Sequence, residues 1–405
     1  MGTKAAISKN GAAREREAPG IKGNLTDADK PVSMTSRERV LAAIRRRPVD
    51  RAPMDFGGTM MSLCLPEFLQ DMRDVLGYSL PEDRDPDGDW VDEQIQRYLE
   101  ADMRAVHNTI PRAILKEIDH EEYLRREKNR NYIRMDEREI ITYQVVTQFP
   151  LRDMPYEDIR DSFRPQANER PSDKHIDWYR ATARKYREGG FAVSYWVTVG
   201  FFEVLCKLRG YDQACVDLVL ERDTAKIIFE RLMEARFKEV EQIVPALEEY
   251  IDIFCFGDDL SMQTGPFMSP ETYRAMIMPF QKPVYDLTNK LAPNSFVFHH
   301  SCGSMFRLLP ILTEMGVSIL NPTQTSASEM EPERLKTYDK ICYHGGIDLQ
   351  EVLPYFKPAD VTRETERAIS ILAPEGGFLC APCHSLPEDV PVENILAMFK
   401  ADRGL

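Results

Sequence analysis

The sequence lacks the features of a secreted or membrane-spanning protein. No apolar run approaches the roughly 18 residues that a membrane helix needs, and residues 1–10 contain no apolar stretch of the kind found in a secretory leader. The eight cysteines among 405 residues are irregularly spaced, which is not the pattern of a disulfide framework. We therefore expect a cytoplasmic protein with reduced cysteines that does not bind a membrane.

The sequence also lacks the charge and the glycine motif of two large classes of binding protein. Its formal net charge is -14, whereas a protein that binds a phosphate backbone needs clustered Lys and Arg. No G-x-G-x-x-G motif follows a predicted strand, so nothing indicates a dinucleotide. We expect a small-molecule or protein partner and no nucleic acid.

The composition that is present predicts one globular domain behind a short tail. Apolar residues make up 43% of the chain and charged residues 29%, which suits a packed core. Residues 1–33 are different, because they show no apolar period and cannot offset the entropy of becoming ordered. A capping box, Thr35 with Glu38, begins the ordered chain. We predict a flexible tail over residues 1–33 and a single domain over residues 34–405.

Short apolar strands alternate with long helices from about residue 190 onward, which is typical of parallel βα units. Strands are predicted at residues 51–55, 191–199, 251–256, 295–298, 317–320, 340–343 and 377–379, and long helices at 223–249, 270–290 and 359–372. Because no dinucleotide motif supports an open doubly wound sheet, we predict a closed (β/α)8 TIM-type barrel. The alternating pattern of residues 132–147 predicts a β-hairpin inserted in that barrel.

Polar segments follow most of the predicted strands. In (β/α) barrels the active site is built from residues just past the carboxyl ends of the strands, so these segments are expected to converge on one mouth. Three carboxylates within them, Asp258, Asp259 and Asp348, are candidates for positioning substrate or for acid–base catalysis. The alternative is a turn or a helix cap, since short acidic side chains commonly form both.

His300 and Cys302 are the best candidates for metal ligands. Side chains two positions apart on an extended segment share a face, so both can bind one ion. Imidazole together with thiolate favours zinc, and three protein ligands leave a position open for substrate. A third ligand is expected from the Cys/His cluster at residues 380–384. The alternative is that these groups are merely buried, as free cysteines often are.

Several segments resemble the uroporphyrinogen decarboxylase superfamily. They are T-S-R-E-R-V at residues 35–40, G-D-D-L at 257–260 with Q-T-G-P at 263–266 and S-P at 269–270, G-G-I-D at 345–348, and D-V-P-V-E-N-I at 389–395. The resemblance covers about residues 34–401. It implies a (β/α)8 barrel, in agreement with the alternation of strands and helices. It also implies one of two activities, because the superfamily contains porphyrinogen decarboxylases and zinc-dependent corrinoid methyltransferases.

The motifs are most similar to those of the methyltransferase branch. Decarboxylases carry R-Q-A-G-R after the first strand to bind substrate carboxylates, whereas residues 54–59 here read M-D-F-G-G-T. Methyltransferases carry H-x-C and a distal Cys as zinc ligands, and His300-Ser301-Cys302 matches the first part. The distal Cys lies nine residues before the Glu of a P-x-E-N segment, which here is the position of His384. The resemblance therefore implies His384 as third ligand or, after a shift of one residue, Cys383.

The two ligand sets imply different reactions. Two thiolates and one imidazole make a formally neutral zinc site, suited to activating a thiolate such as that of coenzyme M. One thiolate and two imidazoles keep a positive charge and a stronger Lewis acid, suited to demethylating a small methoxylated, aromatic compound. The register favours the second set. Its methyl acceptor would be the cobalt of a corrinoid (cobalamin) on a partner protein, because the chain lacks D-x-H-x-x-G. The alternatives are methyl-corrinoid to thiol transfer and a uroporphyrinogen decarboxylase-like lyase.

Overall fold

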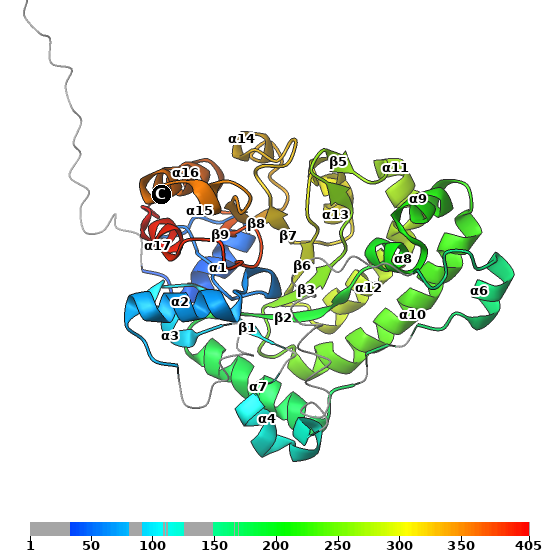
Figure 1. Cartoon of the computed structure of the whole chain (residues 1–405), viewed down its shortest axis with the longest axis horizontal. Helices are drawn as coiled ribbons and strands as arrows, with labels where there is room; N and C mark the ends of the chain where they lie inside the picture. Colours follow the sequence, from blue (N-terminus) through cyan, green and yellow to red (C-terminus); the bar gives the residue numbers. More distant parts are fainter. Residues whose placement is uncertain are drawn as a thin grey trace, which may run out of the picture. The chain divides into compact units, whose positions relative to one another are not determined.

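The computed structural model describes most of the chain (Figure 1). The described residues are 33–80, 91–107, 110, 112–124, 149–165, 167–168 and 170–404. The hairpin predicted at residues 132–147 and nearly all of the tail predicted at residues 1–33 lie outside them. Among the described residues, no helix is both long enough and apolar enough to cross a membrane.

Seven parallel strands form the central sheet, in the order β1-β2-β3-β6-β7-β8-β9. Their bounds are β1 (Met103–Val106), β2 (Ala192–Val199), β3 (Ile253–Gly257), β6 (Phe296–His300), β7 (Ile319–Thr323), β8 (Cys342–Ile347) and β9 (Phe378–Pro382). Each strand pairs in parallel with the next along the chain, as successive βα units produce. A short antiparallel pair, β4 (Ser261–Met262) and β5 (Gly265–Pro266), follows β3.

Residues 53–55 occupy the place of the eighth strand and close the sheet. Met54 forms a parallel bridge with Cys380 of β9, and Asp55 N donates to Cys380 O at 2.9 Å. On the other side, Asp102 N, next to β1, donates to Met54 O at 2.8 Å. The first and last strands of the sheet are thus joined through this segment, which gives the (β/α)8 barrel predicted from the sequence.

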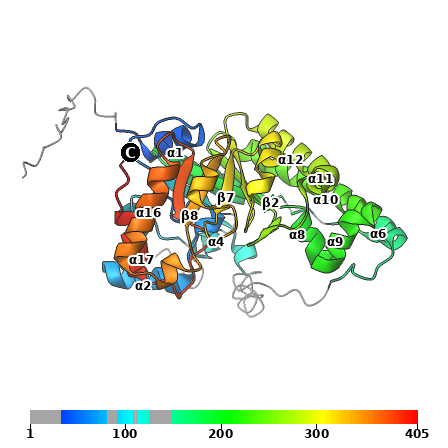
Figure 2. The ribbon, with the colours of Figure 1, turned by 90° about the horizontal axis from the view of Figure 1, so that it is seen from above.

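Helices surround the strands (Figures 1 and 2). They are α1 (Ser36–Ile44), α2 (Pro66–Leu76), α3 (Glu93–Tyr98), α4 (Arg112–Ile118), α6 (Tyr156–Ser162), α7 (Asp173–Glu188), α8 (Phe202–Arg209), α9 (Tyr211–Val219), α10 (Arg222–Leu247), α11 (Pro270–Met276), α12 (Met278–Leu291), α13 (Leu309–Glu314), α14 (Pro332–Leu335), α15 (Val352–Tyr355), α16 (Pro358–Leu372) and α17 (Val392–Lys400), with 3-10 turns at Met60–Ser62 and Phe306–Leu308. The helix predicted over residues 270–290 is two helices, because Pro279 has no N–H with which to continue α11.

Helix α1 begins with the predicted capping box and covers the amino end of the barrel. The Thr35 hydroxyl accepts a hydrogen bond from Glu38 N at 3.2 Å, and the Glu38 carboxylate accepts one from Thr35 N at 2.9 Å. Its buried residues Val40, Leu41 and Ile44 pack against the apolar side chains that fill this end of the interior. Burying each such side chain stabilises the fold by roughly 1.5–3 kcal/mol.

The interior changes from apolar to polar along the strands. Phe298 of β6 and Ile319 of β7 belong to the apolar layer packed on α1. Two residues further along, on the same face of each strand, come His300 and Asn321, which pair with each other in the sheet register. The predicted strands ended at the first polar residues, whereas β6, β7, β8 and β9 continue two to four residues beyond them. Some of the polar groups predicted to follow the strands, among them His300, Asn321 and His344, therefore lie on the strands themselves.

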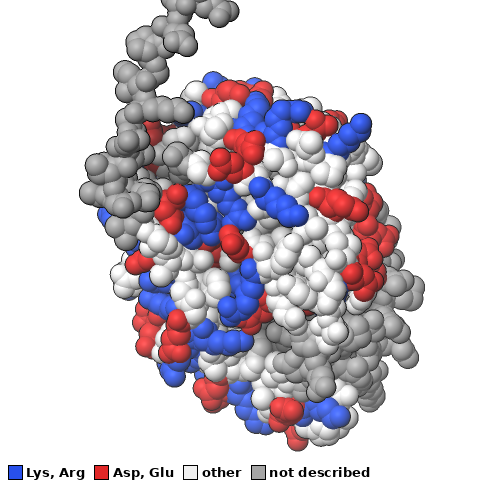
Figure 3. Space-filling model, turned by 90° about the vertical axis from the view of Figure 1, so that its left-hand side faces the viewer, with Lys and Arg blue, Asp and Glu red and all other residues white. Residues whose placement is uncertain are grey.

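Basic and acidic side chains are interspersed on the face that Figure 3 shows. Helix α16 supplies several close pairs, such as Arg367 with Glu333 and Arg363 with Asp360, each at 2.7 Å. Pairs as exposed as these contribute little to stability, typically about 0–1 kcal/mol. The fold therefore depends on the buried interior.

Candidate metal centre

Two imidazoles and one thiol come together at the carboxyl-end mouth of the barrel. His300 is the last residue of β6, Cys302 lies two residues on, and His384 lies in the loop after β9. The ligand atoms of the three residues all lie within 4.8 Å of one another. His300 Nε2 lies 3.6 Å from Cys302 Sγ, and the two imidazole rings are 5.6 Å apart. The structure thus brings together three of the four residues considered as metal ligands.

The separation of the His300 and Cys302 ligand atoms fits a tetrahedral zinc. Ligands at about 2.0–2.1 Å for nitrogen and about 2.3 Å for sulfur lie roughly 3.5 Å apart around such an ion. The observed 3.6 Å between His300 Nε2 and Cys302 Sγ is close to that value. Imidazole nitrogen and thiolate sulfur are also the donors that zinc prefers. In its donor types, and in the separation between His300 and Cys302, the group is therefore suited to zinc.

The fourth candidate, Cys383, points to the backbone of a neighbouring strand. Its Sγ donates a hydrogen bond to Thr323 O at 3.1 Å. Within the described residues it is not part of the group formed by His300, Cys302 and His384. Residues 383 and 384 form a bend after β9, in which the Cys383 thiol faces Thr323 O while the His384 ring lies beside that of His300. The choice of His384 as a ligand stays a prediction, and this placement favours it.

A tight turn holds the Cys302 segment against the β4–β5 pair. Gly303 has a φ of +89°, and an added Cβ would lie 2.6 Å from Met262 O, so only glycine fits this position. Gly303 N donates to Gln324 Oε1 at 2.9 Å, and Cys302 N donates to Asp259 Oδ1 at 2.8 Å. The thiol is therefore carried by backbone that is fixed on both sides.

Asp259 is the predicted acid that lies beside the three-residue group. Besides accepting from Cys302 N, its Oδ1 lies 3.7 Å from His300 Nε2. Its side chain is 38% exposed, so it faces the open side of the mouth. Asp259 is thus placed where it can orient a bound molecule or exchange a proton with it.

Asp258 is directed away from the group and caps helix α8. Its carboxylate accepts hydrogen bonds from the amides of Phe201, Phe202 and Glu203, at 2.9, 3.2 and 2.9 Å, and from Gln281 Nε2 at 3.3 Å. Full burial raises the pKa of Asp258 to about 7, and the backbone hydrogen bonds only partly oppose that rise. These contacts match the helix cap that was the alternative to a catalytic role.

Asp348 caps a different helix, α15, in a similar way. Its Oδ2 accepts from the amides of Gln350, Glu351 and Val352, at 3.1, 2.7 and 3.3 Å, at the start of α15. Its Oδ1 is buried and has no hydrogen-bond partner among the described residues. The structure does not bring Asp348 into the group of His300, Cys302 and His384.

Burial keeps two of the three possible ligands, Cys302 and His384, uncharged when no cation is bound. Burial first, and then the neighbouring Asp259 carboxylate, raises the pKa of the Cys302 thiol well above its usual value. Burial first, and then His300, lowers the pKa of His384 to about 4. A divalent cation would stabilise the thiolate and bind the neutral imidazoles, so this environment suits a metal better than a free nucleophile.

Three further polar residues, to which the sequence assigned no role, connect His300 to the far side of the barrel. His300 Nδ1 lies 2.6 Å from Asn321 Oδ1, and Asn321 Nδ2 lies 2.8 Å from His344 Nδ1. His344 Nε2 lies 2.8 Å from Asp55 Oδ2. Asn321 and His344 stand within buried strands and Asp55 directly follows the bridge residue Met54, so each is a polar residue beside an apolar run, a sequence signal that could have revealed them.

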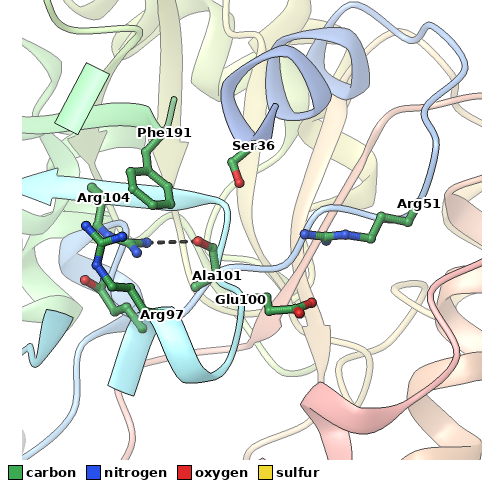
Figure 4. A pocket seen from close by; sticks show the side chains of 8 residues that line it. Ser36, Arg51, Arg97, Glu100, Ala101, Arg104 and Phe191 are labelled. Carbon is green, nitrogen blue, oxygen red and sulfur yellow. Dashed lines mark hydrogen bonds between the residues drawn. The ribbon is translucent and has the colours of Figure 1, made fainter. Parts of the chain in front are cut away.

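A separate pocket of about 210 Å³ lies at the amino end, before the strands begin (Figure 4). It is lined by Ser36, Arg51, Gln96, Arg97, Glu100, Ala101, Arg104 and Phe191. Two of its arginines are already paired: Arg51 with Asp102 at 2.8 Å and Arg97 with Glu93 at 2.6 Å. Buried Arg104 stacks on the Phe191 ring at 3.8 Å and donates to Ala101 O. We therefore place the functional site at the other end.

Comparisons with known proteins agree with the fold. The family model described as uroporphyrinogen decarboxylase (URO-D) matches residues 169–405. A solved methyltransferase from Methanosarcina mazei is 16% identical, with a TM-score of 0.53 over 90% of this chain and 97% of that one, and this likeness shows the fold alone. A GH10 xylanase with a bacterial Ig-like domain, from termite gut, is 6% identical, with a TM-score of 0.37 over 61% and 68% of the two chains. No curated protein sequence matches the chain.

Proposed function

The chain belongs to the uroporphyrinogen decarboxylase family, and from that premise we propose that it is a zinc-dependent methyltransferase of a corrinoid system. Its substrate is proposed to be a small methoxylated, aromatic compound. The methyl group would pass to the cobalt of a corrinoid carried by a partner protein. Residues 54–59 read M-D-F-G-G-T and hold none of the arginines with which a decarboxylase binds substrate carboxylates, so decarboxylation is not favoured.

One observation carries the proposal: His300, Cys302 and His384 place their ligand atoms within 4.8 Å of one another at the mouth of the barrel. Three protein ligands leave a position open on zinc, which is the arrangement of catalytic rather than structural sites. The carboxyl-end mouth is where (β/α) barrels assemble their active sites. The proposed zinc therefore lies where a substrate can reach it.

The mixture of ligands decides which reaction is favoured. Two neutral imidazoles and one thiolate leave a bound Zn²⁺ with one formal positive charge. When bound, zinc would supply a Lewis acid for the ether oxygen of the methoxy group and for the oxygen anion left after demethylation. A second thiolate would make the site neutral and would favour a thiol substrate. Cys383, the residue that would supply it, is hydrogen-bonded to Thr323 O instead.

Asp259 is proposed to work beside the metal. It holds the Cys302 amide at 2.8 Å while its side chain remains 38% exposed. It can therefore orient a substrate at the mouth or deliver a proton to the leaving oxygen. Asp258 and Asp348 are explained by the helices that they cap, and we assign them no part in the reaction.

Metal analysis and a methyl-transfer assay test the proposal together. Protein purified without chelator should contain about one zinc per chain, and Cys302→Ala protein should contain almost none. With cob(I)alamin as free acceptor, a set of methoxylated arenes should yield methylcobalamin, followed by absorbance. Absence of stoichiometric zinc would contradict the metal centre. Full zinc content with transfer only between methylcobalamin and a thiol would contradict the demethylation.

A further inference from the structure

A chain of buried hydrogen bonds connects His300 to Asp55, and we infer that Asp55 is a positioning residue that decides which ring nitrogen of His300 is free to bind the metal. The inference rests on the proposed function, because it takes His300 as a zinc ligand. His300 is 7% exposed, and Asn321, His344 and Asp55 are 0% exposed. Inside the barrel, these groups depend on one another for hydrogen bonds.

The amide of Asn321 gives the chain a direction, since its oxygen only accepts and its nitrogen only donates. Oδ1 faces His300 Nδ1 at 2.6 Å, so that ring nitrogen carries the proton. Nδ2 faces His344 Nδ1 at 2.8 Å, so the proton of His344 lies on Nε2 and is donated to Asp55 Oδ2 at 2.8 Å. In this direction His300 Nε2 keeps its lone pair, and it is the nitrogen that faces Cys302 Sγ.

The reversed chain would satisfy Asn321 equally well but would block the site. With the amide turned over, His344 would carry its proton on Nδ1, and His300 would carry its proton on Nε2, the nitrogen that faces the other ligands. His344 Nε2 would then face the Asp55 carboxylate with no proton between two acceptors, unless the buried ring took up a second proton and a charge. The carboxylate therefore selects the productive direction from three hydrogen bonds away.

Both carboxylate oxygens of Asp55 accept hydrogen bonds, so replacing either oxygen by an NH₂ group would change the hydrogen bonds around it. Gly58 N donates to Oδ1 at 2.8 Å, and the Ser62 hydroxyl donates to Oδ2 at 2.6 Å. A Cβ at position 58 would lie 2.2 Å from Oδ1, so glycine is needed for this approach. In Asp55→Asn, the oxygen must remain on Gly58 N, because a backbone amide only donates. The new NH₂ group then faces His344 Nε2 and donates to it, which reverses the whole chain.

This arrangement extends a common feature of metal sites. A metal-binding histidine usually donates its second ring N–H to a carboxylate or carbonyl oxygen, which fixes the tautomer and the ring orientation. Here the acceptor is the Asn321 amide, and the carboxylate acts through that amide and His344. Because Asp55 must accept a hydrogen bond, His344 and Asn321 are held in one orientation, and this fixes the tautomer of His300 although Asp55 does not contact the metal.

The direct readout is the position of the ring proton of His300 in metal-free protein. It can be read from ¹⁵N chemical shifts of selectively labelled histidines, with His300→Gln protein used for assignment. The wild type should carry the proton on Nδ1, and Asp55→Asn should carry it on Nε2. Zinc affinity, measured by competition with a chromogenic chelator, should fall about 10- to 100-fold in Asp55→Asn.

A second substitution should restore binding without restoring Asp55. A carboxylate at position 321 accepts from Nδ1–H of both histidines, whichever way the rest of the chain runs. The double variant Asp55→Asn/Asn321→Asp should therefore return the His300 proton to Nδ1 and recover zinc affinity. A defect caused only by loosened packing would not be repaired by moving the carboxylate.

Asp217→Asn is the matched control. Its carboxylate is equally buried and pairs with Arg209, between helices α8 and α9, so its loss should destabilise the fold and leave the His300 proton on Nδ1. Three results would overturn the inference. They are a His300 proton on Nε2 in the wild type, an Asp55→Asn variant with the same proton position and zinc affinity as the wild type, and a double variant whose zinc affinity stays low. If the His300 proton is found where predicted in each variant but the protein binds no zinc, the role of Asp55 in the hydrogen-bond chain would be supported and the proposed function contradicted.

Discussion

The two ends of the barrel bury different kinds of polar group: paired charges at the amino end, and gathered metal-binding donors at the carboxyl end. At the amino end, Asp102 accepts hydrogen bonds from Arg39 Nη1 at 2.7 Å, Arg51 Nη1 at 2.8 Å and Met54 N at 2.9 Å. Asp50 accepts from Arg39 Nε at 2.6 Å. Every one of these charges has an opposite charge within hydrogen-bond distance. This network is therefore complete within the protein.

At the carboxyl end, a thiol and two imidazoles lie together in place of paired charges. His300, Cys302 and His384 hold ligand atoms within 4.8 Å of one another, and Asp259 is the charged side chain placed beside them. Among these groups Cys302 Sγ and His300 Nε2 share a weak hydrogen bond at 3.6 Å, and a cation would join all three more strongly. The paired charges of Asp102, Arg39 and Arg51 thus serve the stability of the fold, whereas the gathered donors at the carboxyl end are available for binding, as expected for the two faces of a (β/α) barrel.

The largest change in the free energy of unfolding is expected from breaking the ion pairs of Asp102 at the amino end. Asp102→Ala would leave the guanidinium groups of Arg39 and Arg51 without their shared partner. Removing one member of a buried ion pair typically costs about 3–5 kcal/mol, so the free energy of unfolding should fall by about that amount. Chemical denaturation measures it, and zinc per folded chain should not change.

Glu333→Ala is the control for that experiment, because Glu333 pairs with Arg367 at the surface. Glu333→Ala should lower the free energy of unfolding by less than about 1 kcal/mol. A loss of zinc in Asp102→Ala, at a concentration of denaturant where the protein is still folded, would show that the two ends are not independent.

The next effect concerns the stability that a metal adds at the carboxyl end. A ligand that binds only the folded protein stabilises it by about 2.7 kcal/mol when its free concentration is 100 times the dissociation constant. Zinc at that excess should raise the free energy of unfolding of the wild type by this amount. Cys302→Ala should show almost no increase, because two protein ligands bind far more weakly than three. An equal increase in both proteins would place the zinc elsewhere.

The smallest effect is the pH dependence that Asp50, at the amino end, gives to the free energy of unfolding. Partial burial would raise the pKa of Asp50, but hydrogen bonds from Arg39 and from the Met34 and Arg51 amides lower it from 3.8 to about 2. A carboxylate with a lowered pKa in the folded state stabilises the protein above its unfolded pKa. That contribution is lost as the pH falls from about 4 to about 2. Asp50→Asn should flatten the stability curve over this range, and a curve as steep as that of the wild type would contradict the assignment.

The fold was largely predictable from the sequence because its strands are apolar and regularly spaced. Strand β3 was predicted at residues 251–256 and spans Ile253–Gly257. Strand β1 (Met103–Val106) was missed because Arg104 interrupts its apolar pattern. The structure shows why that residue is tolerated, since the Arg104 guanidinium stacks on the Phe191 ring at 3.8 Å. A long-range contact of this kind leaves no local signal.

The site was predictable only in part, for a similar reason. The spacing of His300 and Cys302 and the count from Glu393 to His384 pointed to three residues that the structure brings together. The hydrogen bond between Asp55 and His344 joins residues 289 positions apart, and no pattern of neighbouring residues reveals it. Pairing across a barrel depends on register, which becomes visible only when the strands are placed.

The central claim is that His384, and not Cys383, completes the metal site, and the zinc content of two variants tests it most directly. His384→Ala should lose zinc and methyl transfer together, because two protein ligands remain. Cys383→Ser should keep about one zinc per chain, since the Cys383 thiol is bound to Thr323 O. The opposite result, with zinc lost from Cys383→Ser and retained in His384→Ala, would contradict the account. It would place two thiolates on the metal and make a thiol the substrate.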